Sequence, residues 1–178
     1  NDAAALDGAN TYVELENPAG LNFGGPLTLE AWILPAASPN SESYILAHGG
    51  NDTYTEETLL RIENGNYQIG STHGHASMPA PAGDLGGGHW VDLVGTWDGA
   101  NWNIYRNGVL GNSSPDAYGP SLVDNANWAI GGRGRWKYES GLVDPGQDTR
   151  MFNGAIDEAA IYDRALTPSQ VQAHYAKS

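Results

Sequence analysis

Several long polar segments of the chain place aromatic side chains beside carboxylate, amide, guanidinium and imidazole groups. Aromatic rings can cover the apolar face of a sugar ring, and Asn, Asp, Arg and His side chains can bind its hydroxyl groups. The segment Arg133 to Glu139 contains a Trp and a Tyr among charged residues, so it fits this combination of side chains best. The composition therefore predicts a ligand-binding surface built from loops. The candidate ligand-binding residues are Asn51, Asp52, Tyr54, His73, His75, Arg135, Trp136, Tyr138 and Glu139.

Core packing is the alternative for any aromatic residue. Trp32 and Trp97 alternate with apolar neighbours in strand-like runs, so we assign both to the core. Trp136 is flanked by Arg135 and Lys137 instead, which favours an exposed ring.

His73 and His75 flank Gly74 in another polar segment. A His-x-His pair can ligate zinc or copper, but a third ligand cannot be identified in the sequence. We therefore favour hydrogen bonding to a ligand, or simple exposure on the surface, over metal binding for this pair.

No residue pattern in the chain supports catalysis. Glycoside hydrolysis needs two facing carboxylates, and alternation along a strand would point Asp157 and Glu158 to opposite faces. The chain also lacks Gly-x-Ser-x-Gly, a phosphate-binding loop and His-Glu-x-x-His. We therefore expect a protein that is not an enzyme.

The elements that must position these groups are short strands. The chain has 24 Gly, 10 Pro, 6 Trp and 9 Tyr, which suits many strands joined by turns. Asn64-Gly65, Asp98-Gly99 and Asn107-Gly108 are typical of hairpin turns. Period-two alternation predicts strands at 12–15, 27–34, 44–47, 59–63, 67–71, 90–97, 102–106, 128–130 and 154–162. The segments 36–43, 48–57, 72–89 and 133–153 are predicted to be long loops.

One short helix is expected at the end of the chain. Thr167 is a suitable N-cap, Pro168 suits the first helical position, and Val171 and Tyr175 lie four residues apart on one face. No internal repeat or shift in composition divides the chain, so we predict one domain over residues 1–178.

Charge and hydropathy exclude some partners. With 8 Lys and Arg against 21 Asp and Glu, the formal charge is −13, which would repel nucleic acid. The same acidity can simply keep a protein soluble, or it can suit a hard cation such as calcium. No apolar run of about 18 residues is present, so membrane insertion is not expected. The chain has no Cys, so neither a disulfide framework nor a thiolate metal site is available. It does not begin with Met, which predicts attachment to other domains of a longer chain.

Three blocks of the sequence resemble laminin-G-like, concanavalin A-like jelly-roll domains, with distant similarity to pentraxins and carbohydrate-binding modules. The resemblance implies an all-β fold: a two-sheet antiparallel jelly-roll sandwich with a short C-terminal helix. The resembling blocks are residues 5–15 with 27–33, residues 89–108, and residues 152–167.

Members of this family occur beside bacterial glycoside hydrolases and lyases, in adhesins and in animal extracellular proteins. The resemblance therefore implies a non-catalytic, lectin-like module that binds an oligo- or polysaccharide. We therefore expect the module to lie outside the cell, as part of a larger bacterial protein that is secreted or attached to the cell surface. A protein-interaction or spacer module of an adhesin is the alternative, and a glycoside hydrolase or lyase is a third reading.

The family also implies calcium. A structural calcium in related domains maps by motif onto Asp7 and Asp157, with main-chain oxygens completing the shell. Alternatively, Asp7 only shapes its turn and Asp157 accepts backbone donors. By analogy with pentraxins, further calcium could bridge the acidic segments 51–57 and 139–148, or these could be solvated acidic loops.

Overall fold

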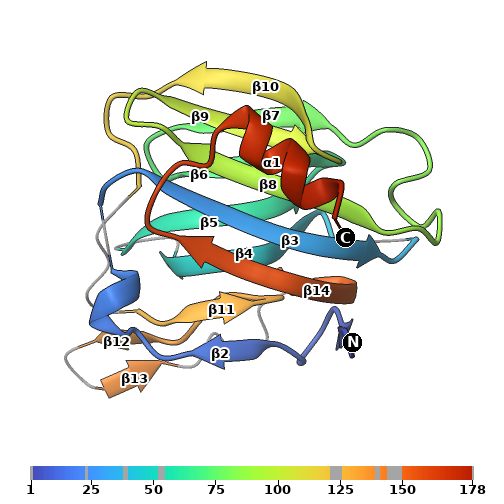
Figure 1. The fold of residues 1–178 in the computed structure, drawn as a ribbon. Coiled ribbons are helices and arrows are strands. Elements are labelled where there is room, and N and C mark those ends of the chain that lie inside the picture. The colour runs from blue at the N-terminus through green and yellow to red at the C-terminus, as the bar shows by residue number, and fades with distance from the viewer. Residues whose placement is uncertain are drawn as a thin grey trace.

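The computed structural model describes residues 2–22, 24–37, 40–51, 55–120, 126–138, 141–143 and 150–177. For residues 50, 51, 55–57, 136–138 and 141–143 it describes the backbone alone. Two antiparallel six-stranded sheets face each other, and one short helix lies on the outside of the first sheet (Figure 1). The expected fold class is therefore confirmed.

The first sheet has the strand order β1-β14-β3-β8-β9-β10. Its centre is β3, a run of β-branched, aromatic and other apolar residues that pairs with β8 on one side and β14 on the other. The strands of this sheet are β1 (Ala4–Asp7), β14 (Asn153–Tyr162), β3 (Leu27–Pro35), β8 (Val91–Trp97), β9 (Asn101–Arg106) and β10 (Val109–Pro115).

The second sheet has the order β2-β11-β4-β5-β6-β7. A two-stranded hairpin, β12 (Trp136–Tyr138) with β13 (Gly141–Val143), forms a separate small sheet, and η1 (Ala19–Leu21) is a single 3₁₀ turn. The strands of the second sheet are β2 (Val13–Leu15), β11 (Trp128–Ile130), β4 (Glu42–Asn51), β5 (Thr55–Glu63), β6 (Asn66–Ser71) and β7 (His75–Pro79).

The predicted hairpin turns are confirmed. Asn64 and Gly65 have φ values of 48° and 76°, and Asn107 and Gly108 have 50° and 75°. Both φ values of a type I′ turn are positive, a conformation that Asn and Gly tolerate. These turns join β5 to β6 and β9 to β10, so neighbouring strands pair in the order in which the chain makes them.

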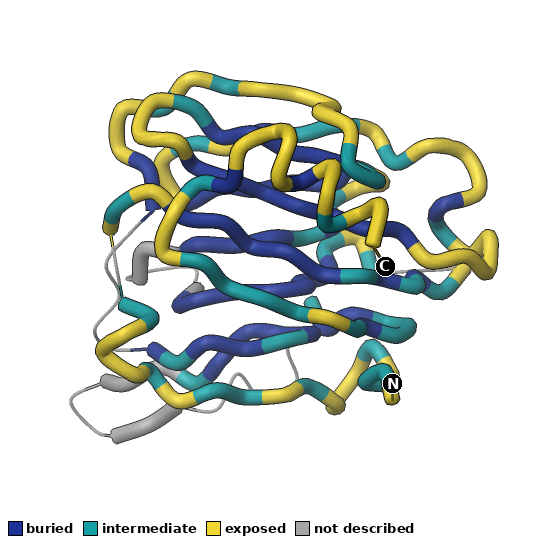
Figure 2. The backbone as a smooth tube through the Cα atoms, in the orientation of Figure 1, coloured by how far each residue is buried: buried dark blue, intermediate teal, exposed yellow. Residues whose placement is uncertain are grey.

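The apolar core fills the space between the two sheets (Figure 2). Alternation along β3 directs Leu29, Ala31 and Ile33 inward, and each is fully buried. Trp102 and Trp128 are also fully buried, one from each sheet. At one edge the sheets meet directly, because the Asn112 side chain on β10 donates to the Ser77 carbonyl on β7 at 2.8 Å.

The helix α1 (Pro168–Tyr175) covers part of the outer face of the first sheet. Thr167 caps it as predicted: its side chain accepts from the Gln170 N–H, and the Gln170 side chain accepts from the Thr167 N–H. Val171 is fully buried against Val94 and Tyr105, which face outward from the sheet. The predicted terminal helix is therefore confirmed.

Several predictions about local structure were wrong. Segment 48–57, predicted as a loop, belongs largely to β4 and β5, and the predicted loops 72–89 and 133–153 contain β7, β12 and β13. Trp32 was assigned to the core but faces outward, half-buried, with its ring 5.8 Å from the ring of Tyr175 on α1. A helix packed on the outside of a sheet creates a second apolar layer there, so strand alternation alone cannot distinguish the inner face from a covered outer face.

Candidate functional site

One end of the sandwich gathers the turn between β6 and β7 and the loop that follows β10. Tyr118 from this loop is 72% exposed, and its ring centroid lies 4.9 Å from that of His73 in the turn. Both rings are open to solvent, since His73 is exposed as well. We call residues 72–74 and 116–119 the Tyr118 surface.

Asp116 holds this surface in place. One of its carboxylate oxygens accepts from the Tyr118 N–H at 3.0 Å, and the other accepts from the Gly119 N–H at 3.1 Å and from Trp102 Nε1 at 2.7 Å. Burial alone would raise the pKa of Asp116, but these hydrogen bonds outweigh it and lower the pKa. Asp116 is therefore ionised at neutral pH and ties the loop to a buried core tryptophan.

Two glycines allow the loop to pack this closely. Gly119 has φ +69°, and a Cβ there would lie 2.4 Å from the Trp97 ring. A Cβ on Gly74 would lie 2.9 Å from Cγ of Asp116. The Tyr118 surface thus rests on core aromatics without intervening side chains, and it is preorganised for binding.

The same end of the second sheet carries the backbones of several predicted site residues. Ser71 of β6 pairs with Thr58 of β5, and Asn51 pairs with Thr55 where β4 turns into β5. The Asn127 N–H donates to the Arg135 carbonyl, so β12 continues toward this end and contacts β4. Figure 1 shows β12, β13 and η1 on this side of the molecule.

The structure therefore brings the backbones of Asn51, His73 and Trp136 to one end of the sandwich. The side chains of Asn51, Trp136 and Tyr138 lie outside the described part of the structure, as do Asp52, Tyr54 and Glu139 altogether. The acidic segments 51–57 and 139–148, considered for bridging calcium, also fall largely outside it. Their role stays a prediction.

Two predicted site residues have other surroundings. The Arg135 side chain is 42% exposed and pairs with Glu14 on β2, which accepts from both its Nε and its backbone N–H. His75 is exposed and lies on β7, opposite Gly70 of β6. It follows His73, the residue whose ring contacts Tyr118, by two positions. Within the described ranges, no group of three or more His, Asp or Glu side chains could hold a metal ion.

Asp7 and Asp157 do not meet. Asp7 pairs with Asn153 across β1 and β14, and Asp157 lies four residues further along β14, about 13 Å away at the usual strand rise. The Asp7 Oδ1 atom accepts three backbone N–H bonds, from Ala9, Asn10 and Thr11, at 2.9 to 3.0 Å. These bonds lower the pKa of Asp7 well below its usual range. The geometry matches the alternative in which Asp7 shapes its own turn, and it does not assemble a calcium site from this pair.

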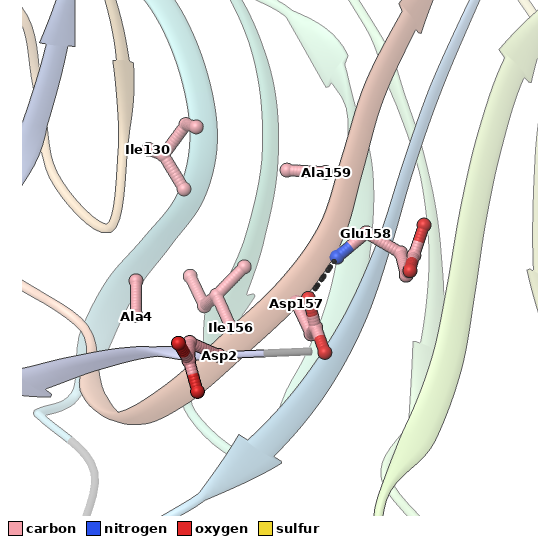
Figure 3. Close-up of a pocket in the computed structure, with 7 residues that line it drawn as sticks. All are labelled: Asp2, Ala4, Ile130, Ile156, Asp157, Glu158 and Ala159. Atoms are coloured by element: carbon pink, nitrogen blue, oxygen red, sulfur yellow. Dashed lines mark hydrogen bonds between the residues drawn. The ribbon is translucent and has the colours of Figure 1, made fainter.

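A shallow cavity of about 360 Å³ lies at the open edge of the sandwich, between β1, β14 and β11 (Figure 3). Asp157 and Glu158 both line it, but Figure 3 shows the Glu158 carboxylate directed away from that of Asp157, so they do not form a facing pair. A β-bulge lies between Asp157 and Ala160, at which Glu158 has φ +49° and donates its N–H to Asp157 Oδ1. The lining residues are Asp2, Ala4, Ile130, Ile156, Asp157, Glu158 and Ala159.

Tyr118 was missed by the sequence analysis. Its signal was the run Pro115-Asp116-Ala117-Tyr118-Gly119-Pro120, in which Asp accepts backbone N–H groups two and three residues ahead. Such a turn between two prolines presents its third residue outward. An aromatic residue at that position is an indication of a binding surface.

Comparison with known proteins identifies the fold family. A family model described as the concanavalin A-like lectin/glucanases superfamily matches residues 7–172. No curated protein sequence matches the chain. No helix in the described ranges is long and apolar enough to span a bilayer.

Many solved structures share the fold. Domain 4 of AbnA, a GH43 extracellular arabinanase from Geobacillus stearothermophilus in complex with arabinotriose, has a TM-score of 0.69 and 24% identity over 96% of this chain and 75% of its own. The Ruminococcus gnavus IT-sialidase CBM40 bound to α2,3 sialyllactose has a TM-score of 0.73 and 16% identity, over 98% of this chain and 97% of its own. A putative carbohydrate binding protein from Bacteroides ovatus has a TM-score of 0.69 and 20% identity over 96% of this chain. The present chain spans only 45% of the length of that B. ovatus protein.

Proposed function

Because the chain belongs to the concanavalin A-like lectin/glucanases superfamily, we propose that it is a non-catalytic carbohydrate-binding domain. The Tyr118 surface is its proposed binding site. We place the domain outside the cell as part of a longer chain, by analogy with the neighbour that is domain 4 of an extracellular arabinanase. We also propose that calcium stabilises the domain, as the family resemblance implies.

The observation that carries the proposal is the exposed ring of Tyr118 on a rigid base. Tyr118 is 72% exposed, and a flat aromatic ring matches the apolar face of a sugar ring. Asp116 and the buried Trp102 fix its backbone, so little conformational entropy is lost when a ligand binds. His73 lies beside it, and a histidine ring is of a type that can hydrogen-bond to sugar hydroxyl groups.

The test is sugar binding by wild type and by Tyr118→Ala. A glycan array identifies the ligand, and isothermal titration then measures its affinity. Loss of one central aromatic contact should weaken binding about tenfold, because such anchors contribute more than about 1 kcal/mol. Tyr118→Phe keeps the ring face and should bind within about twofold of wild type.

The matched control is Val109→Ala, which removes an apolar side chain that is 67% exposed on β10. It should leave affinity unchanged, and circular dichroism should show all variants folded. Sugar binding that survives both Tyr118→Ala and His73→Ala would move the site elsewhere on the domain. Absence of binding to every glycan would favour the protein-interaction alternative.

A further inference from the structure

A carboxyl group lies buried beneath the last turn of α1. Asp92 is 0% exposed, and neither of its carboxylate oxygens has a hydrogen-bond partner among the described residues. Its backbone is regular, since its N–H donates to Asn107 Oδ1 at 3.0 Å and its carbonyl accepts from the Asn107 N–H at 2.8 Å. An ionised carboxylate in such surroundings is costly, so this position favours the protonated acid.

The cover over Asp92 is Tyr175. On one side of Asp92 lies its cross-strand neighbour Trp32, on which the Tyr175 ring is stacked at an interplanar angle of 15°. On the other side lies the Asn107-Gly108 turn, where a Cβ on Gly108 would be 3.1 Å from Cβ of Tyr175. Tyr175 thus bridges the two strands that flank Asp92, and Figure 1 shows α1 lying across this face of the sheet.

A second carboxylate lies next to the first. Glu30 on β3 has a side chain that is 8% exposed, and its two oxygens lie 3.0 and 3.2 Å from Nδ1 of His174 on α1. Burial and then the negative charge of Glu30 raise the pKa of Asp92 to about 7, while His174 acts in the opposite direction. The last turn of α1 therefore covers two carboxyl groups, and His174 on this turn acts against their negative charge.

The other titratable or charged groups on the elements packed here do not offset Asp92. Tyr105 on β9 and Tyr162 on β14 are neutral at physiological pH, and burial raises the pKa of each. Arg106 on β9 is engaged by Asp84, and Arg164 lies over the ring of Tyr162 at 5.9 Å. Lys177 follows α1 and is exposed.

We propose that the last turn of α1 is a proton-dependent latch on the first sheet. It stays docked while Asp92 is protonated, and it lifts more often once Asp92 is ionised, because lifting returns the carboxylate to water. Release also uncovers the indole of Trp32. The helix is held at its other end by Val171 and by the Thr167 cap, so the opening is confined to the residues after Val171.

The sign of the pH effect follows from the raised pKa. The docked state binds a proton more tightly than the lifted state, in which Asp92 regains an ordinary pKa near 3.8. Docking is therefore strongest in acid and weakens as pH rises from about 4 to about 7. With these two values, linkage gives an opening constant that rises about 30-fold between pH 5.5 and pH 8.5.

Millisecond hydrogen-exchange mass spectrometry, corrected for intrinsic exchange rates, tests the latch. In wild type, protection of residues 172–176 should fall about 30-fold between the two pH values, while protection of β3 and β8 amides stays unchanged. Asp92→Asn keeps the shape without the charge and should show less than about threefold change. Asp163→Asn, an exposed carboxylate just before α1, should behave as wild type.

Equal pH dependence in wild type and Asp92→Asn would overturn the proposal, as would a parallel loss of protection in β3. If Asp92→Asn does not fold, ¹³C titration of the wild-type carboxyl replaces it. The Asp92 carboxyl and the α1 amides should then titrate with one common midpoint. Separate midpoints would also refute the latch.

Discussion

Asp84 shows how a single buried carboxylate can fix a loop. It lies in the segment between β7 and β8, its side chain is 2% exposed, and it accepts from the Arg106 guanidinium and from the Tyr67 hydroxyl at 2.9 Å. Its other near neighbour is His89, at 3.3 Å. Burial alone would raise the pKa of Asp84, but the bonds from Arg106, Tyr67 and His89 outweigh it and lower the pKa.

Asp84→Asn should therefore destabilise the protein by about 3 kcal/mol, because it leaves a partly buried guanidinium without its anion. The contribution of Asp84 is present above its ordinary pKa of 3.8 and is lost as the pH falls through its lowered folded value. Urea unfolding at pH 7 and below pH 4 measures both effects. The variant should lose less stability in acid than wild type does, and an unchanged acid slope would contradict this assignment. Asp163→Asn serves as the exposed control.

The sequence identified residue types at the candidate site better than it identified individual residues. His73 was predicted and lies on the Tyr118 surface, but Tyr118 itself was missed because its partner His73 lies 45 positions away in the chain. Asp7 and Asp157 were paired by motif, yet the register of β1 with β14 separates them. A contact that depends on strand register cannot be read from local spacing.

At the scale of elements, local signals were reliable where a turn or cap requires a particular residue. Asn64-Gly65, Asn107-Gly108 and Thr167-Pro168 each marked a boundary correctly, because only a few residue types suit those backbone conformations. The edge strands β1, β7 and β10 were missed. β10 is exposed along almost its whole length, and β1 and β7 are short with irregular burial, so their sequences lack clear alternation.

The cap of α1 gives a prediction at this scale. Thr167→Ala removes the side chain that accepts from the Gln170 N–H and should cost about 1 kcal/mol of stability in chemical unfolding. Thr167→Ser keeps the acceptor and should lie within about 0.3 kcal/mol of wild type. Because the cap lies at the end of α1 opposite Tyr175, protection from hydrogen exchange should fall across the whole helix and not only after Val171. A Thr167→Ala variant as stable as wild type would show that packing alone holds the helix.

At the scale of the whole molecule, the two sheets were predictable because nine strands were recognised from alternation and their hairpins follow one another. The pairing of β14 between β1 and β3, and of β11 between β2 and β4, was not predictable from periodicity. These pairings join residues 80 or more positions apart, and they depend on how the complete core packs.

The net charge of −13 gives a prediction for the complete domain. Few cations offset 21 acidic residues, so repulsion between carboxylates destabilises the compact state and salt should relieve it. Raising NaCl from 10 to 200 mM should stabilise the protein by about 1 kcal/mol, a shift in melting temperature of roughly 2–4 °C.

Magnesium and calcium chloride at matched ionic strength separate screening from specific binding. Screening alone gives equal shifts with both salts, whereas a larger shift with calcium would indicate a cation site in the acidic loops. A melting temperature that falls with NaCl would mean that attractive ion pairs such as Glu14 with Arg135 outweigh the repulsion.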